Sequence, residues 1–342
     1  MKTVLTSLTP AEIAAELELK PFQGRQIFCW IHQKQVFDFE AMTNLSKALR
    51  TRLSEQYAAV QMTPLEVQES AVSGTKKVLL GLPDGESVES VLIRDRDRIT
   101  LCVSSQVGCP LKCAFCATGQ AGFTRNLTAG EIVEQALFLL AGENLEGRTP
   151  NVVYMGMGEP FWNYDEVIKS IRLFMDENGL NIGARKITVS TVGEVKGIER
   201  FAEEDWQVRL SISLHAANDA LRSRLVPLSR KYPLDRLREA IELYLSKTGR
   251  QITFEWTLLD GVNDSLDDAR ELVEYIGELK AVVNLIPWNP VPGMDFRPSP
   301  DGRCNAFLEA LNTAGVKATL RREKGQDIDA ACGQLRSRQP KT

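Results

Sequence analysis

Residues 98–116 read RITLCVSSQVGCPLKCAFC, a strand-like run followed directly by a loop with three closely spaced cysteines. The run at 99–104 begins a new pattern, because strand-like and helical segments alternate from there to residue 321. Six further strands are expected at 151–157, 186–191, 207–214, 251–258, 281–286 and 316–321. This alternation predicts an α/β fold with a parallel sheet, either open and doubly wound or rolled into a full or partial barrel.

The chain before this stretch has a different pattern. Residues 1–60 carry apolar side chains at helical spacing, with a capping box at Thr9. The runs 77–82 and 87–94 are strand-like and are joined by a turn, whereas 59–74 is expected to be an irregular connection. We therefore expect a helical accessory domain at 1–60, a linker and β-hairpin at 61–97, the barrel at 98–322 and a C-terminal segment at 323–342.

Composition narrows the class of protein. In 342 residues, 43% are hydrophobic and 25% charged, as in globular proteins rather than disordered or coiled-coil chains. With a net charge of -4, the protein as a whole does not carry the positive charge that would attract nucleic acid, although a local basic patch would be enough to bind it. There is no signal peptide pattern and no stretch of about eighteen apolar residues, so we expect a cytoplasmic protein without a membrane partner. Seven cysteines favour reduced thiols with a chemical role over a disulfide scaffold.

The three cysteines of the opening stretch, Cys109, Cys113 and Cys116, have the spacing C-x3-C-x2-C. Soft thiolates on one short loop suit an iron–sulfur cluster or zinc. Structural zinc needs four protein ligands, and the other candidates are Cys102 in a strand and two histidines remote in sequence. A cubane cluster on three cysteines leaves one iron open to a small molecule. The spacing therefore favours the cluster over zinc, and both over three unliganded core cysteines.

The cysteine spacing, with an aromatic residue before the last cysteine, resembles that of the radical S-adenosylmethionine (SAM) superfamily. Six stretches more narrowly resemble the bacterial RlmN-type ribosomal RNA adenine methyltransferases: TLCVSSQVGC from Thr100, GFTRNL from Gly122, GMGEP from Gly156, SLH from Ser213, IPWNP from Ile286 and DIDAACGQL from Asp327. The resemblance runs nearly end to end. It implies a partial (β/α) barrel of the radical SAM type, a 4Fe–4S cluster on the three cysteines, and two molecules of SAM per turnover.

The resemblance also implies residues that bind the cofactor, namely Gly158, Glu159, Ser190, Ser213, Leu214, His215 and Asn289. These positions follow the expected strands, and active sites of β/α barrels gather at the carboxyl ends of strands. Glu159 can accept a hydrogen bond from the methionyl ammonium. Taken alone, the glycines would be ordinary turns and His215 a structural histidine, and Trp288 would be a packing residue or a base-stacking one.

Three further residues receive roles from the resemblance. Carbon 2 of adenine lies between two ring nitrogens and is a poor nucleophile, so its methylation needs a radical route. The resemblance implies that Cys332 is methylated first and carries the carbon, that Cys102 releases the RNA by forming a disulfide, and that Glu89 accepts the proton from carbon 2. Without the resemblance, Glu89 would be interpreted as a solvated strand residue and Cys102 as an ordinary buried cysteine. The small residues around Cys332 predict a segment that moves.

The implied partners are 23S ribosomal RNA, transfer RNA as a second candidate substrate, and an electron donor such as flavodoxin or ferredoxin, with the enzyme acting as a monomer. Candidate RNA contacts are Phe22, Arg25, Lys34 and Arg50 in the accessory domain, Arg94, Arg96, Arg98 and Arg125 near the cluster, and residues 321–342, which hold six Lys and Arg against three Asp and Glu. Arg336 and Arg338 replace small residues expected after the last motif, which leaves the packing of the tail open.

Three alternatives stay open. One is methylation of carbon 8 of the same adenine, which the context of Trp288 disfavours by resemblance only. Another is a different radical enzyme that acts on a small molecule or a protein and needs no pair of cysteines such as Cys102 and Cys332. The last is a zinc-stabilised RNA-binding protein without catalytic activity.

Overall fold

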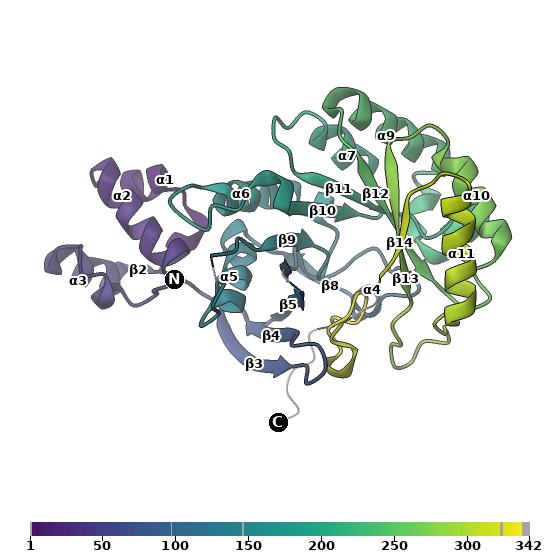
Figure 1. Cartoon of the computed structure of the whole chain (residues 1–342). Coiled ribbons are helices and arrows are strands. Elements are labelled where there is room, and N and C mark those ends of the chain that lie inside the picture. Colours follow the sequence, from purple (N-terminus) through teal and green to yellow (C-terminus); the bar gives the residue numbers. More distant parts are fainter. Residues whose placement is uncertain (1, 97, 146, 322–323, 337–342) are drawn as a thin grey trace.

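The computed structural model describes residues 2–96, 98–145, 147–321 and 324–336. Its centre is a ten-stranded sheet of order β14-β13-β12-β11-β10-β9-β6-β5-β4-β3 (Figure 1). Seven of its strands are parallel: β6 (Arg98–Cys102), β9 (Asn151–Tyr154), β10 (Ile187–Thr191), β11 (Arg209–Ser213), β12 (Ile252–Leu258), β13 (Ala281–Pro287) and β14 (Ala318–Leu320). The seven strands expected from the alternating pattern are therefore confirmed.

The winding of the sheet decides between the expected architectures. The parallel strands follow one another in chain order, so every crossover advances in the same direction and places its helix on the same face. A doubly wound sheet would reverse its order at a switch point. The helices of this layer are α5 (Ala129–Leu140), α6 (Tyr164–Met175), α7 (Val195–Phe201), α8 (Asp219–Leu225), α9 (Leu234–Thr248), α10 (Leu266–Ile276) and α11 (Asp301–Thr313). With β14 at one edge of the sheet, the fold is a partial barrel, as predicted.

The core lies between the sheet and this helical layer. An apolar stripe on α6 is buried, with Val167 and Ile171 fully inaccessible to solvent, and Phe174 packs edge-on against Tyr154 of β9. A capping box formed by Thr128 and Glu131 begins α5. No helix in the described part of the chain is both long and apolar enough to cross a membrane.

Three antiparallel strands extend the barrel wall. The predicted hairpin is formed by β4 (Lys76–Gly81) and β5 (Ser87–Asp95), and β5 pairs with the first barrel strand β6. The expected irregular connection is wrong in part, because residues 63–69 form the edge strand β3 (Thr63–Glu69). Its side chains are exposed almost throughout, so no alternation of apolar and polar residues marks it, and Pro64 is tolerated because the strand is at the edge.

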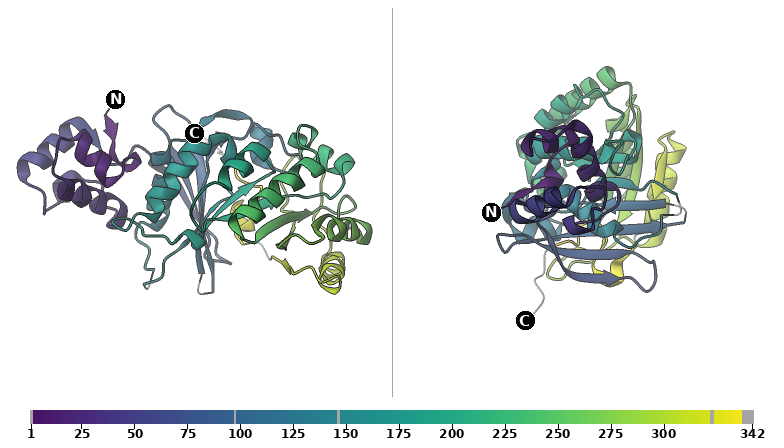
Figure 2. Two further views of the ribbon diagram at one scale, coloured as in Figure 1. Left: turned by 90° about the horizontal axis from the view of Figure 1, so that it is seen from above. Right: turned by 90° about the vertical axis from the view of Figure 1, so that its left-hand side faces the viewer.

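The amino-terminal residues form a small helical unit at one end of the molecule (Figure 2). It contains α1 (Pro10–Glu16), α2 (Pro21–Phe28) with a π-helical turn at Cys29–Gln33, α3 (Lys47–Gln56) and the strand pair β1 (Thr3–Val4) and β2 (Tyr57–Ala58). The capping box at Thr9 is present. Short 3-10 turns occur at Leu5–Ser7, Phe39–Ala41, Pro160–Asn163, Ala184–Lys186, Pro227–Arg230 and Gln326–Ile328.

A buried carboxylate joins the helical unit to the barrel. Glu134 of α5 accepts hydrogen bonds from the Thr6 hydroxyl at 2.6 Å and from the backbone amides of Gln61 and Met62 at 3.0 and 2.7 Å. Burial nevertheless raises the pKa of Glu134 to about 7. Glu134 therefore connects α5 to both ends of the amino-terminal unit, beside other contacts such as that between the rings of Phe37 and Phe138.

Candidate active site

The three cysteines lie on a loop whose ends are tied by a short antiparallel ribbon. Strand β7 (Gln106–Gly108) pairs with β8 (Phe123–Asn126), and α4 (Ala117–Ala121) begins directly after Cys116. The Cys109 amide donates to the Gly122 carbonyl at 2.7 Å. Gly108 has a φ of +76°, and a Cβ there would lie 2.0 Å from the same carbonyl oxygen. The loop can therefore close only because residue 108 has no side chain.

One cavity at the carboxyl ends of the parallel strands gathers nearly all the predicted cofactor and metal residues. Cys109, Cys113, Cys116, Gly158, Glu159, Ser190, Ser213, His215 and Asn289 line it, together with Cys332. Leu214 is not among the lining residues, because its side chain is fully buried elsewhere and its carbonyl accepts from Arg222. Residues far apart in the sequence thus meet at one place, as the barrel geometry requires.

The donor set suits an iron–sulfur cluster. Within the described residues, no three Cys, His, Asp or Glu side chains converge closely enough to hold one metal ion, so the thiols border a space rather than meeting at a point. Burial raises the pKa of Cys109 to about 12 and that of Cys113 well above its ordinary value, and the charge of Cys116 adds to both effects. Thiolates at this site therefore need a cationic partner, which the irons of a cluster provide.

Glu159 and the glycines before it are held tightly against β6 and β7. The two carboxylate oxygens of Glu159 accept from the backbone amides of Phe161 and Val192, at 3.1 and 3.0 Å, and burial raises its pKa to about 7. A Cβ on Gly156 would lie 2.7 Å from the Ser104 hydroxyl. One on Gly158, whose φ is +105°, would lie 2.6 Å from the Cβ of Gln106. The two glycines are thus needed for packing of the protein itself.

His215 faces the cavity in a fixed protonation state. Its Nδ1 accepts a hydrogen bond from the Thr257 amide at 3.0 Å, so the ring proton is on Nε2. Burial lowers the pKa of His215 to about 3, which keeps the ring neutral. Its backbone has a φ of +60°, a strained conformation for a residue with a side chain, and Asn263 donates to its carbonyl. A neutral imidazole with one available N–H donor suits a polar ligand.

Two buried side chains act on the cysteine loop, one through a hydrogen bond and the other through its charge. Trp288 lines the cavity and donates its indole N–H to the carbonyl of Phe115 at 2.9 Å, which favours the packing interpretation of this residue. Arg222 is almost fully buried and donates to the backbone carbonyls of Leu214 and Val192 at 3.2 and 2.6 Å. Its positive charge acts to lower the pKa of Cys113. Sequence reasoning missed Arg222, because an arginine in a short helix gives no sign of burial.

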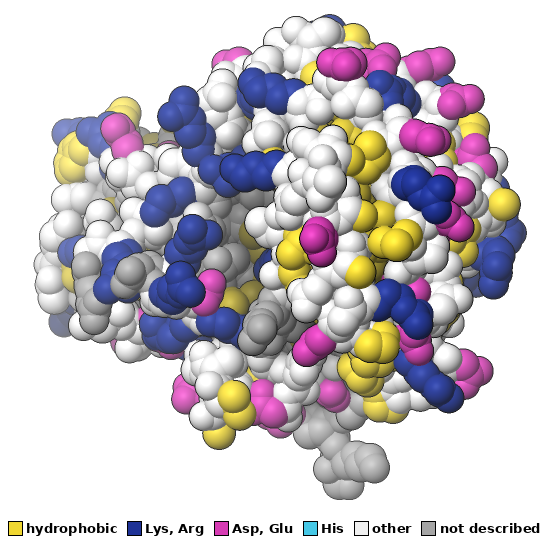
Figure 3. All heavy atoms as spheres, turned by 45° about the vertical axis from the view of Figure 1, so that its right-hand side comes forward, with side chains coloured by type: hydrophobic (Ala, Val, Ile, Leu, Met, Phe, Trp, Pro, Cys, Tyr) yellow, Lys and Arg dark blue, Asp and Glu magenta, His cyan; other side chains and the backbone are white. Residues whose placement is uncertain are grey.

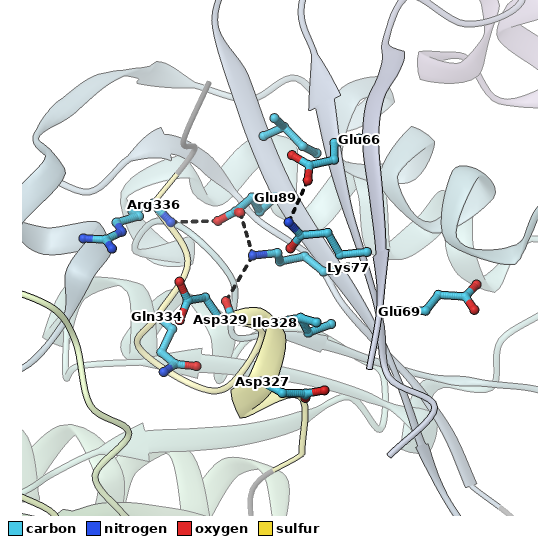
Figure 4. Close-up of a pocket in the computed structure, with 11 residues that line it drawn as sticks. Glu66, Glu69, Lys77, Glu89, Asp327, Ile328, Asp329, Gln334 and Arg336 are labelled. Atoms are coloured by element: carbon cyan, nitrogen blue, oxygen red, sulfur yellow. Dashed lines mark hydrogen bonds and ion pairs between the residues drawn. The ribbon is translucent and has the colours of Figure 1, made fainter. Parts of the chain in front are cut away.

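Glu89 lies in a separate pocket of about 460 Å³, between the outer strands and the C-terminal segment (Figure 4). It is only 5% exposed, so the interpretation as a solvated strand residue does not hold. One carboxylate oxygen is 3.1 Å from the ammonium of Lys77, and the other accepts from the Arg336 amide at 2.8 Å. Lys77 also reaches the carbonyl of Asp329 at 3.4 Å. The strand face and the segment are therefore joined through this carboxylate (Figure 4).

The segment that carries Cys332 is docked against the barrel. The carbonyls of Cys332, Gly333 and Leu335 accept from Asn289, from the Ala117 amide and from the Thr118 hydroxyl, at 3.1, 2.8 and 2.5 Å. Cys102 is buried at the end of β6, in register with Val91 and Val153 on the two neighbouring strands. Movement of the segment stays a prediction. Residues 322, 323 and 337–342, which include Arg338, lie outside the described residues.

Several candidate RNA contacts already have acidic partners. Arg125 is bound to Asp84 at 2.5 Å and to both oxygens of Glu131 at 2.9 Å, and Arg94 is paired with Glu143. In the helical unit, by contrast, Phe22, Arg25 and Lys34 line one surface pocket, where the Lys34 ammonium lies 3.7 Å from the centre of the Trp30 ring. On one face of the molecule, Lys and Arg side chains gather beside a hollow (Figure 3).

Comparison with known proteins agrees with this geometry. Residues 103–276 match the radical SAM superfamily, and residues 8–59 match the ribosomal RNA large subunit methyltransferase N-terminal domain. The chain is 48% identical to a probable dual-specificity RNA methyltransferase RlmN of Staphylococcus saprophyticus, over 94% of this chain and 88% of that protein. It is also 48% identical to the dual-specificity RNA methyltransferase RlmN of Halorhodospira halophila, over 92% of this chain and 88% of that protein.

A solved structure is similar over almost the whole chain. The crystal structure of a radical SAM methyltransferase from Sphaerobacter thermophilus superimposes with a TM-score of 0.95 at 46% sequence identity. The match covers 98% of this chain and 100% of that one. Similarity of this extent includes the helical unit, the outer strands and the barrel alike.

Proposed function

The chain belongs to the RlmN family of radical SAM RNA methyltransferases, and from this premise we propose that it methylates carbon 2 of an adenine in 23S ribosomal RNA. An adenine in transfer RNA is the second candidate substrate, in keeping with the dual specificity in the names of its relatives. The observation that carries the proposal is the single cavity in which the three cysteines, the strand-end residues and Cys332 meet. A zinc-stabilised protein without activity is no longer a candidate.

The cofactors are a 4Fe–4S cluster and SAM. Cys109, Cys113 and Cys116 would hold the cluster, which would supply the electron for reductive cleavage of SAM bound in the same cavity. Glu159, with each carboxylate oxygen already oriented by a backbone amide, would accept from the methionyl ammonium. His215 would offer its Nε2 proton to a polar group of the same ligand. The role proposed for these side chains is to bind SAM and to orient it.

Three further residues would take part in the transfer of the methyl carbon to the RNA and in the release of the product. Cys332, on the docked segment beside the cysteine loop, would accept a methyl group on sulfur and carry it to the base. Glu89 would remove the proton from carbon 2 of the adenine, and the ammonium of Lys77, 3.1 Å from one carboxylate oxygen, would hold this side chain in place. Cys102 would attack the sulfur of Cys332 to form a disulfide and release the product. A thiol pool such as that of the cytoplasm, where we propose the enzyme acts, would then reduce the disulfide.

The RNA is proposed to contact the surface pocket of the helical unit, with Phe22 available for stacking and Arg25 and Lys34 for phosphates. The target adenine must leave its stack to reach a buried site. We propose a small electron-transfer protein such as flavodoxin or ferredoxin as the reductant, and a monomer as the active form.

The deciding experiment is anaerobic incubation of the reconstituted enzyme with 23S ribosomal RNA and methyl-labelled SAM, followed by nucleoside mass spectrometry. We expect labelled 2-methyladenosine, and with transfer RNA the same nucleoside. Label at carbon 8 would assign the chain to the alternative position. Label in neither nucleoside, from a preparation that contains iron and acid-labile sulfide and cleaves SAM, would overturn the proposal.

A further inference from the structure

A row of polar side chains crosses the inside of the barrel wall. Ser213 of β11, Glu255 of β12, Asn284 of β13 and Thr319 of β14 are register partners on four successive strands. Partners in parallel strands point to the same face of the sheet. The interior of a β/α barrel is ordinarily filled with branched apolar side chains. A polar row that includes a buried carboxylate is costly there and needs a specific reason.

Hydrogen bonds within the row fix one oxygen of Glu255 and leave the other available. The Thr319 hydroxyl donates to the Asn284 side-chain carbonyl at 2.8 Å, and the Asn284 amide donates to Oε1 of Glu255 at 3.0 Å. The Ser211 hydroxyl donates to the same Oε1 at 2.9 Å. Oε2 is buried and has no hydrogen-bond partner anywhere in the described residues. The network thus holds the side chain in one orientation with a single acceptor unused.

Glu255 lines the same cavity as the predicted cofactor residues. It is 5% exposed, and its register partner Ser213 is one of those residues. A buried acceptor without a donor destabilises a fold, and such groups are rare in native proteins. The missing partner is therefore expected to come from a ligand in the cavity, and that ligand must present an O–H or N–H group.

The chemistry of the cavity indicates which part of the ligand this is. The cysteine loop and Glu159 belong to the methionyl end, whereas Glu255 is on β12, among Thr257, Ile286 and Ser213. A carboxylate oxygen in such a setting matches the vicinal hydroxyls of a sugar. We propose that Glu255 binds the ribose of SAM, with Oε2 accepting from a ribose hydroxyl. This assignment rests on the proposed function, because it takes SAM as the ligand of the cavity.

The test measures binding rather than turnover. Cluster-loaded wild type and Glu255→Gln are titrated anaerobically with S-adenosylhomocysteine and with its 2′-deoxy and 3′-deoxy forms. In the wild type, we expect at least one deoxy form to bind about tenfold more weakly than the parent, because Oε2 would again be a buried acceptor without a donor. In Glu255→Gln, the parent should bind about tenfold more weakly, and the penalty for the same deoxy form should disappear.

Glu134→Gln is the matched control, since it neutralises a buried carboxylate remote from the cavity and should keep the wild-type penalty. Equal binding of all three ligands by the wild type, or an unchanged penalty in Glu255→Gln, would mean that a water molecule satisfies Oε2 and would overturn the assignment.

Should Glu255→Gln fail to fold, a crystal structure of the wild-type complex with S-adenosylhomocysteine decides, because a ribose more than about 3.5 Å from Oε2 is outside hydrogen-bond distance. Formation of 2-methyladenosine by the same wild-type preparation separates the two claims. If methylation proceeds while the ribose prediction fails, only the assignment of Glu255 falls.

Discussion

The cofactor cavity and the pocket around Glu89 are built from the chain in opposite ways. The cavity takes one or a few residues from the end of each successive strand, so each contribution is a short local motif. The pocket joins side chains of β4 and β5 to the backbone of residues 329 and 336, more than 240 positions later in the sequence. Barrel topology makes local motifs converge, whereas a pocket closed by a distant segment leaves no local pattern.

The strongest test of this division is the loss of either of the two cysteines with proposed catalytic roles, Cys332 and Cys102. Cys332→Ala should abolish RNA methylation, since the proposed carrier of the carbon is gone. Cys102→Ala should stop after one turnover with RNA covalently attached to Cys332, because no thiol releases it. Denaturing gels and nucleoside mass spectrometry measure both outcomes. Cys304→Ala, in the buried core of α11, should behave as the wild type. Equal amounts of adduct from both variants would refute the assigned roles.

A smaller effect is expected from Lys77, which belongs only to the Glu89 pocket. Lys77→Met should slow RNA methylation about a hundredfold, because the proposed base Glu89 loses the cation that orients it. Methyl loading of Cys332, measured by intact-protein mass spectrometry, should be unchanged, and Lys77→Arg should recover much of the rate. Lys76 is equally buried but pairs with Glu143, so Lys76→Met is the matched control. Equal loss of methyl loading in Lys77→Met would show that the two regions are not separable.

On the cavity side, the packing of Gly158 predicts a loss of stability. In Gly158→Ala the new Cβ would meet Gln106 at 2.6 Å in a left-handed backbone conformation, which should cost about 2–3 kcal/mol of unfolding free energy. Gly122 also has a positive φ, +93°, but a Cβ there would have nothing within 4 Å. Urea denaturation of Gly122→Ala therefore measures the backbone cost alone. If both variants lose the same stability, the contact with Gln106 has no role.

The smallest expected effect lies outside both regions, at Glu134. Burial raises its pKa from 4.5 to about 7, so the folded protein favours the protonated form. The contribution of Glu134 to the free energy of unfolding is therefore fully present below about pH 4.5 and is lost as pH rises to about 7. Between these limits, the melting temperature of the wild type should fall by about 2–4 °C relative to Glu134→Gln. If the melting temperatures of the two proteins change with pH in parallel, the Glu134 carboxyl is ionised in the folded protein throughout this range.

Most of the barrel could be predicted from sequence, because its seven parallel strands alternate with amphipathic helices and each strand has a buried face. Strand β3 could not, because its exposed side chains, Leu65 and Val67 included, carry no alternation. Of the candidate site, the strand-end positions followed from periodicity and from the resemblance together. Arg222 and Lys77 were missed because burial of a charge is visible only when its partners are in place. Glu255 had a signal, since Thr253, Glu255 and Thr257 alternate with Phe254 and Trp256.

The order of the strands has a consequence for a substrate as large as folded RNA. Strand β14 is an edge, and β6 continues into the outer strands instead of closing the ring. The stretch from 324 to 336 bridges this opening, bonded to Asn289 and Pro290 on one side and to Glu89 and Asp95 on the other. The circumference of the barrel thus includes a seam made of one short peptide, the segment whose movement the sequence predicts. If the segment moves as predicted, a nucleotide still attached to its neighbours enters through that side, whereas a complete ring would admit only what fits its mouth.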